Sequence, residues 1–293
     1  MSGQLRTLKN RIRSISSTKK ITRAMEMVSA SKLKRYQKMV VEGTPYAEGL
    51  LNLLKRVSAA GAETNHPLLG GDNSSGRHEK KKALFVFTAD AGLSGSFNLD
   101  LITSAGKFLK DEKEKPAMFG VGKMGVQALK RSGATFEKTF VETKSAEIES
   151  VILAIRDAAL EVFMSGRADA VYVTYSRFIN ASRFQAVTEK LLPFSLDTTS
   201  ATQPAAEENY EIEPDANTLF EKLVPAVFGM RIRRIFLESF VSEQMARMNA
   251  MHQATENASE LIDELVLERN KARQAAITKE LIEIISGSKA MKA

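Results

Sequence analysis

The chain has 293 residues, 43% of them hydrophobic, and no cysteine. It can therefore hold one large or two ordinary domains, and it excludes disulfides, thiolate metal sites and cysteine nucleophiles. The net charge of +7 is uneven: residues 1–60 contain 13 Lys and Arg against 3 Asp and Glu, whereas residues 215–293 contain 11 of each. The basic N-terminal part predicts an acidic partner, which is nucleic acid, anionic lipid or protein.

Hydropathy argues against membrane insertion and secretion. No apolar run approaches the ~20 residues that span a bilayer. The N-terminus is basic and helical and lacks the apolar core of a secretion signal. We therefore expect a chain that is not itself inserted into a membrane.

The first 60 residues predict one long helix with a single interruption. Apolar residues step by three and four along Leu5, Leu8, Ile12 and Ile15. Ile21, Met25 and Val28 continue the row, and Leu33, Tyr36 and Met39 follow them. Gly43, Thr44 and Pro45 predict a kink or a brief break, after which the pattern resumes. Residues 61–82 are polar and glycine-rich, which predicts a loop.

Residues 83–194 predict a Rossmann-like α/β domain, because short strand patterns alternate with amphipathic helical ones. The expected strands are 83–88, 117–119, 136–141, 170–175 and 183–192. The expected helices are 99–111, 123–131 and 146–164. This alternation favours a largely parallel sheet.

The C-terminal part, residues 215–293, predicts a second long helix after a linker at 195–214. Its stretch from Ser242 to Gly287 has no proline and consists of good helix formers. We expect Pro225 and Gly229 to kink or restart its first turns.

One face of that helix carries mostly small or flexible side chains. Its apolar row is Leu237, Val241, Met248, Met251, Ala258, Ile262, Leu265, Ala272 and Ala276, and the polar residues Gln244, Thr255, Arg269 and Lys279 interrupt it. Small residues allow a second helix to approach closely, and methionine fills irregular gaps. The simplest fold is an antiparallel coiled coil of the N- and C-terminal helices with the α/β domain between them in sequence.

Gly120, Gly122 and Gly125 match the G-x-G-x-x-G pattern of dinucleotide-binding turns, and Glu142 follows about 20 residues later. Pyrophosphate at a helix N-terminus is one interpretation. The other, which we favour, is a strand-to-helix turn that needs glycine for packing alone.

The loop from Thr88 to Asn98 could hold phosphate on its N–H groups, or Asp90 could act as an acid. It lacks the lysine of a P-loop, and no nucleophile accompanies Asp90, so a tight turn is favoured.

His66, His78 and His252 are scattered and do not predict a metal site. We expect no catalytic centre, no cofactor and no metal.

The basic run Lys32, Lys34, Arg35 and Lys38 has one aromatic neighbour, Tyr36. It is compatible with nucleic-acid binding, with a solvated helix face, or with an acidic protein partner.

Three blocks of the sequence resemble the gamma subunit of bacterial F-type ATP synthases: Ile12–Gln37, Thr88–Asn98 and Ser242–Gly287. The KITRAMEMV and ELIDELVLERNKARQAAITKELIEI segments are the most specific. The resemblance covers essentially the whole chain. The paired cysteines of the light-regulated plant form are absent, so that thiol switch is not expected.

This resemblance implies a non-catalytic, single-copy rotor in the central stalk, which couples transmembrane proton flow to ATP synthesis and regulates ATPase activity. The implied partners are the alpha and beta subunits of the catalytic head, the epsilon subunit and the membrane ring of c subunits. The implied location is the cytoplasmic face of the bacterial inner membrane, as a peripheral protein.

The resemblance also implies contact residues. We expect Lys32, Arg35 and Lys38, with Met25 beside them, to face acidic loops of the catalytic subunits. We expect the bearing to consist of the Ile277–Ile285 end together with the Leu5–Ile15 end. Arg247, Arg273 and Gln274 are candidate polar catches, and Glu207, Glu208 and Tyr210 are candidates near epsilon and the ring.

Two other functions remain as alternatives. A nicotinamide-dependent oxidoreductase would use the Gly120–Gly125 turn, and it leaves the long helices unexplained. A nucleic-acid scaffold would use the basic first helix and would bind more weakly as salt rises.

Overall fold

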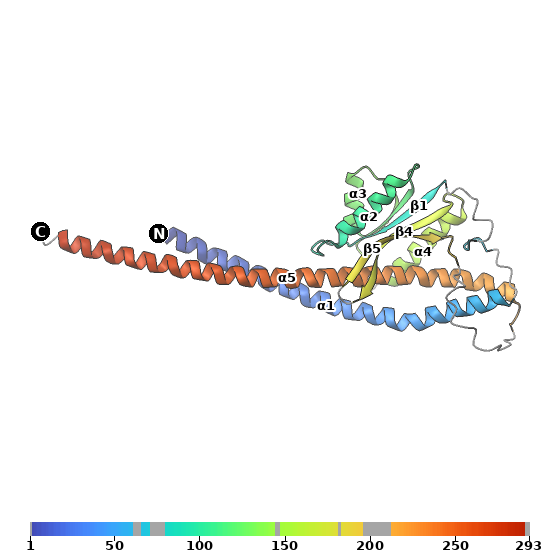
Figure 1. Cartoon of the computed structure of the whole chain (residues 1–293), viewed down its shortest axis with the longest axis horizontal. Helices are drawn as coiled ribbons and strands as arrows, with labels where there is room; N and C mark the ends of the chain where they lie inside the picture. The colour runs from blue at the N-terminus through green and yellow to red at the C-terminus, as the bar shows by residue number, and fades with distance from the viewer. Residues whose placement is uncertain are drawn as a thin grey trace. The chain divides into compact units, whose positions relative to one another are not determined.

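The computed structural model describes residues 2–60, 66–70, 80–143, 147–180, 183–195 and 212–290 (Figure 1). Its elements in order are α1 (Ser2–Ala59), β1 (Lys82–Phe87), α2 (Phe97–Asp111), β2 (Ala117–Val121), α3 (Lys123–Arg131), β3 (Phe136–Phe140), α4 (Ile148–Met164), β4 (Ala170–Asn180), β5 (Arg183–Leu192) and α5 (Ala216–Ala290). Each expected strand and helix is therefore present, with bounds that shift by a few residues. Two compact units result: residues 1–31 with 247–293, and residues 32–246.

The larger unit, residues 32–246, is built on a five-stranded sheet in the order β3-β2-β1-β4-β5. The first four strands pair in parallel and β5 joins β4 antiparallel, which confirms the predicted mixed α/β fold. Alternate residues of β1 enter different cores, because side chains alternate across a strand. Phe85 and Phe87 pack in the core that contains α4 and parts of α1 and α5, and Leu84 and Val86 pack against α2 and α3.

Parts of both long helices belong to this core. The ring of Tyr36 on α1 meets that of Phe240 on α5 edge-on, with 4.6 Å between centroids. Phe236 of α5 approaches Phe87 of β1 in the same way at 6.2 Å. The α/β layer therefore closes around helix segments that come from both ends of the chain.

Neither long helix is broken, so the predicted break in α1 and restart in α5 are wrong, while a kink at these positions stays a prediction. Helix α1 runs through Pro45 without interruption, and α5 runs through Pro225 and Gly229. A proline removes one backbone hydrogen bond. Leu54 and Phe228, on the same helices, are fully buried, so core packing outweighs that local loss.

The segment 66–70 is more ordered than a polar loop. Leu68 and Leu69 are buried, and Leu69 forms an isolated bridge with Phe194. The N–H of Leu68 donates to Nδ1 of His66 at 3.1 Å, which requires a lone pair on that nitrogen. The predicted loop therefore contains a short anchor into the core.

His66 should make the larger unit less stable in acid. Burial lowers the pKa of the His66 ring from its ordinary value of 6.5, and Glu221 partly opposes this effect. Below pH 6.5 the unfolded chain takes up a proton that the folded chain still excludes, so stability falls as pH falls toward the lowered folded pKa. The urea midpoint should drop from pH 7.5 to 5.5 by more in the wild type than in His66→Gln. Equal drops would contradict this expectation.

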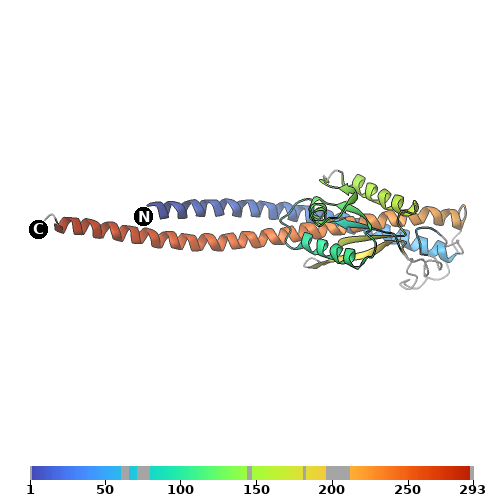
Figure 2. The same cartoon turned by 90° about the horizontal axis from the view of Figure 1, so that it is seen from above.

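The smaller unit contains residues 2–31 of α1 and 247–290 of α5, which lie side by side and run antiparallel in both views (Figures 1 and 2). On α1 the inward positions alternate by three and four residues: Leu5, Leu8, Ile12, Ile15, Lys19, Thr22, Glu26 and Ser29 are all buried or half-buried. On α5 the same spacing continues through Met251, Thr255, Ala258, Ile262, Leu265, Arg269, Ala272 and Ala276. These are heptad seams, and the predicted soft row of α5 is confirmed.

The predicted α1 row is wrong at two positions. Ile21 and Val28 are 61% and 55% exposed, whereas the adjacent Thr22 and Ser29 are buried. The seam keeps its seven-residue period and accepts polar residues to do so, because a shift of one residue turns a side chain by about 100°.

No helix within the described ranges is both long enough and apolar enough to cross a bilayer.

Candidate functional site

The glycine turn after β2 is filled by the chain's own atoms. Gly122 has φ +88°, and a Cβ there would lie 1.9 Å from the carbonyl oxygen of Thr88. A Cβ at Gly125 would lie 2.5 Å from the Thr88 side chain, and one at Gly120 would lie 2.3 Å from Val126. All three glycines are therefore explained by close approach of the β1 end, α3 and neighbouring side chains.

The N-terminus of α3 has no free donor for a pyrophosphate. The N–H groups of Lys123, Met124 and Gly125 donate to Asp90 Oδ1, the Ala89 carbonyl and Thr88 Oγ1 at 2.9–3.0 Å. The N–H of Gly122 donates to the Phe140 carbonyl at 2.8 Å. These are the four groups that a dinucleotide would need.

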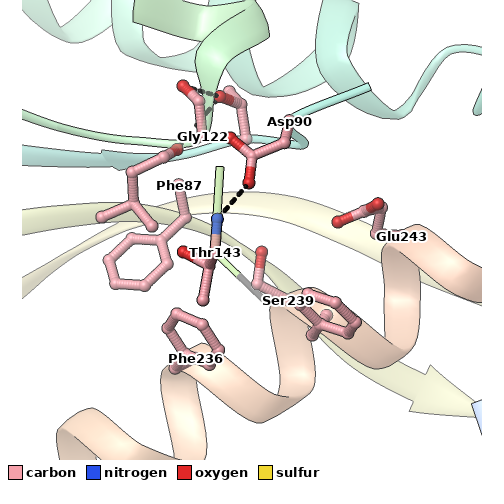
Figure 3. A pocket seen from close by; sticks show the side chains of 10 residues that line it. Phe87, Asp90, Gly122, Thr143, Phe236, Ser239 and Glu243 are labelled. Atoms are coloured by element: carbon pink, nitrogen blue, oxygen red, sulfur yellow. Dashed lines mark hydrogen bonds between the residues drawn. The ribbon is translucent and has the colours of Figure 1, made fainter. Parts of the chain in front are cut away.

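Asp90 takes the place that an anionic ligand would occupy. Its second carboxylate oxygen accepts from the N–H of Thr143 at 3.0 Å, so it ties the β1 end to α3 and to the segment after β3. Figure 3 shows this bond beside a cavity of about 30 Å³, with Phe236, Ser239 and Glu243 of α5 on its other wall. That volume is about the share of one water molecule and is far too small for a nucleotide.

Glu142, the expected ribose ligand, is paired within the chain. Its Oε1 accepts from Nζ of Lys123 at 2.9 Å, and this hydrogen bond lowers the pKa of the Glu142 carboxyl. The dinucleotide interpretation is therefore wrong for this turn, and the packing interpretation holds. Asp90 likewise has a structural role, because both of its carboxylate oxygens accept backbone N–H groups and neither is left to act in catalysis.

The histidines do not gather. Within the described residues no three His, Asp or Glu side chains are grouped as a metal site would require. His66 lies by Leu68, His252 lies on α5, and His78 is outside the described residues.

The seam of the smaller unit holds a buried polar layer. The hydroxyls of Thr22 and Thr255 are 2.8 Å apart, and both side chains are buried. Counting sevens from Leu8 through Ile15 reaches Thr22, so the heptad was the signal that could have located this layer. Thr255 appeared in the sequence only as an interruption.

Beside this layer lies an open groove of about 670 Å³. It is lined by Ser16, Lys19, Lys20, Arg23, Ala24, Met27, Thr255 and Ile262. Its lining has three cations and no acidic side chain, over an apolar floor. The groove therefore favours an acidic, partly apolar partner segment.

The Thr22–Thr255 hydroxyl pair should be less stable than two apolar residues in the same places. Removing only one of the two hydroxyls should nevertheless reduce stability. Thr22→Val or Thr255→Val alone should destabilise the helical pair by about 1 kcal/mol, because the remaining buried hydroxyl loses its cross-helix partner and keeps only its backbone acceptor, the carbonyl of Lys19 or of Met251. The double variant should regain or exceed the wild-type value. Hydrogen exchange of residues 16–29 measures this, with the exposed Thr18→Val as control. Additive losses would contradict it.

A family model described as ATP synthase matches residues 4–291. The chain is 38% identical over 293 residues to the ATP synthase gamma chain of Ralstonia nicotianae, covering 97% of this chain and 98% of the relative. It is 37% identical over 294 residues to that of Anaeromyxobacter sp. strain K, covering 98% and 99%.

The chain belongs to the ATP synthase gamma chain family.

Solved structures agree on the fold. A chain of the Euglena gracilis mitochondrial ATP synthase superposes with a TM-score of 0.67 at 19% identity, covering 99% of this chain and 95% of that one. A chain from a Tetrahymena thermophila structure titled central stalk and c-ring gives 0.58 at 22%, covering 80% and 99%.

The basic residues of α1 that we expect to contact a partner are exposed. Lys32, Arg35 and Lys38 all lie at the surface, and Met25 is half-buried. Nζ of Lys38 lies 3.6 Å from a Glu42 oxygen, with both side chains mostly exposed. These charges are therefore accessible in the isolated gamma-type chain.

The three residues expected to make polar contacts with the ring of catalytic subunits differ in their exposure. Arg273 and Gln274 are exposed, whereas Arg247 is only 8% exposed and is held within the chain. At the expected bearing, Ile277 and Ile285 are 50% and 58% exposed. The remaining candidates, Glu207, Glu208 and Tyr210, lie outside the described residues.

Proposed function

We propose that this chain is the rotor of an F-type ATP synthase, a non-catalytic central-stalk subunit that couples ion flow across the membrane to ATP synthesis or hydrolysis in the catalytic head. The observation that carries this is the near full-length match to gamma chains. The antiparallel helical pair of the smaller unit supports it, because a stiff elongated pair suits a shaft.

The asymmetry of such a shaft supplies the mechanism. One gamma-type chain cannot present the same face to equivalent catalytic subunits around it, so each subunit is biased to a different conformation. Rotation of the gamma-type chain then takes each catalytic subunit through these conformations in turn. The proposed partners are the alpha and beta subunits, the epsilon subunit and the ring of c subunits, and the proposed place is the cytoplasmic face of the bacterial inner membrane.

The exposed residues fit transient contacts. We assign Lys32, Arg35 and Lys38 to acidic loops of the catalytic subunits, because exposed charges attract without holding one position strongly. The cationic groove at Lys19 and Arg23 supports the same partner chemistry. Arg273 and Gln274 are the exposed catches, and Ile277 to Ile285 form the apolar bearing.

Co-purification tests the proposal. A tagged copy of the chain, expressed in its own organism, should bring down nucleotide-binding subunits in excess over itself, together with a small subunit and a membrane ring. Recovery of the tagged chain alone, or with nucleic acid that salt removes, would overturn it.

A further inference from the structure

The middle of the helical seam is polar on the α1 side. Four consecutive inward positions of α1 are Lys19, Thr22, Glu26 and Ser29, each buried or half-buried. Apolar packing is therefore weakest here, and the open groove lies alongside. The cross-helix hydrogen bonds at this level join Thr22 with Thr255 and Glu26 with His252.

His252 places both of its ring nitrogens against carboxylates. Nδ1 lies 3.1 Å from Oε1 of Glu26 on α1, and Nε2 lies 3.4 Å from Oε1 of Glu256 on α5. A neutral imidazole has one N–H and one lone pair, so it can donate to only one of these carboxylates. The imidazolium has an N–H on each ring nitrogen, so it presents a donor to Glu26 and a positive charge to Glu256 at the same time.

Glu26 has a further need for positive charge. Its side chain is 18% exposed, and its buried Oε2 atom has no hydrogen-bond partner. Arg23, on the same helix, approaches that oxygen only to 3.8 Å. The charged groups that face His252 are therefore Glu26 with Arg23 behind it on α1, and Glu256 on α5.

We propose that His252 is a proton-operated clamp, which closes the polar middle of the helical pair when its ring binds a proton and bridges Glu26 to Glu256. Histidine is the side chain that ordinarily changes charge between about pH 5 and 8. The clamp therefore adds stability at the acidic end of that range and loses it as pH rises. If the proposed rotor function holds, the shaft is stiffer at this level in a more acidic cytoplasm.

Hydrogen exchange on the full chain tests the clamp without any partner. Peptides covering 248–259 and 19–30 are followed at pH 6.0 and 8.0 in the wild type, His252→Gln and Glu26→Gln. Comparing variants at one pH cancels the intrinsic pH dependence of exchange. At pH 6.0 both variants should open roughly two- to five-fold more often than the wild type, the size of one partly exposed ion pair. At pH 8.0 His252→Gln should match the wild type.

The control is Glu283→Gln, which removes an exposed carboxylate from a Lys279 pair on the same helix and should leave the polar middle unchanged at both pH values. A His252→Gln effect of equal size at pH 6.0 and 8.0 would mean that the ring only fills space, and would overturn the clamp. If both variants exchange at the same rate as the wild type at pH 6.0, the clamp is also overturned. Neither result bears on the rotor function, which co-purification tests separately.

Discussion

Alanine at Gly122 is expected to destabilise the α/β unit severely. The added Cβ would lie 1.9 Å from the Thr88 carbonyl oxygen, which is backbone and cannot swing aside, and the residue has φ +88°. Clash and strain together should cost more than about 4 kcal/mol, a large part of the 5–15 kcal/mol that holds a typical domain. Urea unfolding followed by circular dichroism measures the loss.

Gly133 supplies the matched control. It has the same φ of +88°, and nothing lies within 4 Å of its added Cβ. Gly133→Ala therefore carries the backbone strain alone and should cost only about 1 kcal/mol. If the two variants were equally stable, the close approach of α3 to the β1 end would not be what requires Gly122.

Reversing the charge at Lys32, Arg35 and Lys38 together should uncouple the assembled enzyme. Three exposed cations become three anions, so an attraction to acidic loops becomes a repulsion. ATP hydrolysis should persist while proton pumping per ATP falls several-fold. Fluorescence quenching in membrane vesicles, measured beside phosphate release, gives the ratio.

The control reverses the same number of charges elsewhere. Lys107, Lys110 and Lys113 are also exposed and also spaced by three residues. Changing these to glutamate alters the net charge identically and should leave pumping per ATP near the wild-type value. If both triple variants pump alike, the α1 cations are not the ones that face the catalytic subunits.

The sequence located the glycine turn, and only the fold could show what fills it. The spacing of Gly120, Gly122 and Gly125 was correct for a strand-to-helix turn. The group that occupies the anion position is Asp90, more than 30 residues earlier, and its place depends on the pairing of β1 with β2. Local patterns do not contain such long-range pairings.

The wrong predictions on the long helices arose because local sequence signals were followed where packing and the seven-residue period decide the structure. Pro45 and Pro225 are strong local signals for a break, and tertiary packing overrides them. Ile21 and Val28 were expected in the seam because they are apolar. The seven-residue period, which was present in the sequence, selects Thr22 and Ser29 instead.

The unequal lengths of the two helices in the smaller unit have one more consequence. Because Thr22 lies opposite Thr255, Ser2 lies near the level of Ala275, and α5 continues beyond that level to Ala290 (Figure 2). Every described side chain from Ile277 to Ser288 is exposed. A lone helix of that length is marginal in water. We therefore expect the part of α5 beyond Ala276 to open more readily in the isolated chain than the paired part, and a partner that surrounds it in the proposed assembly should slow its hydrogen exchange.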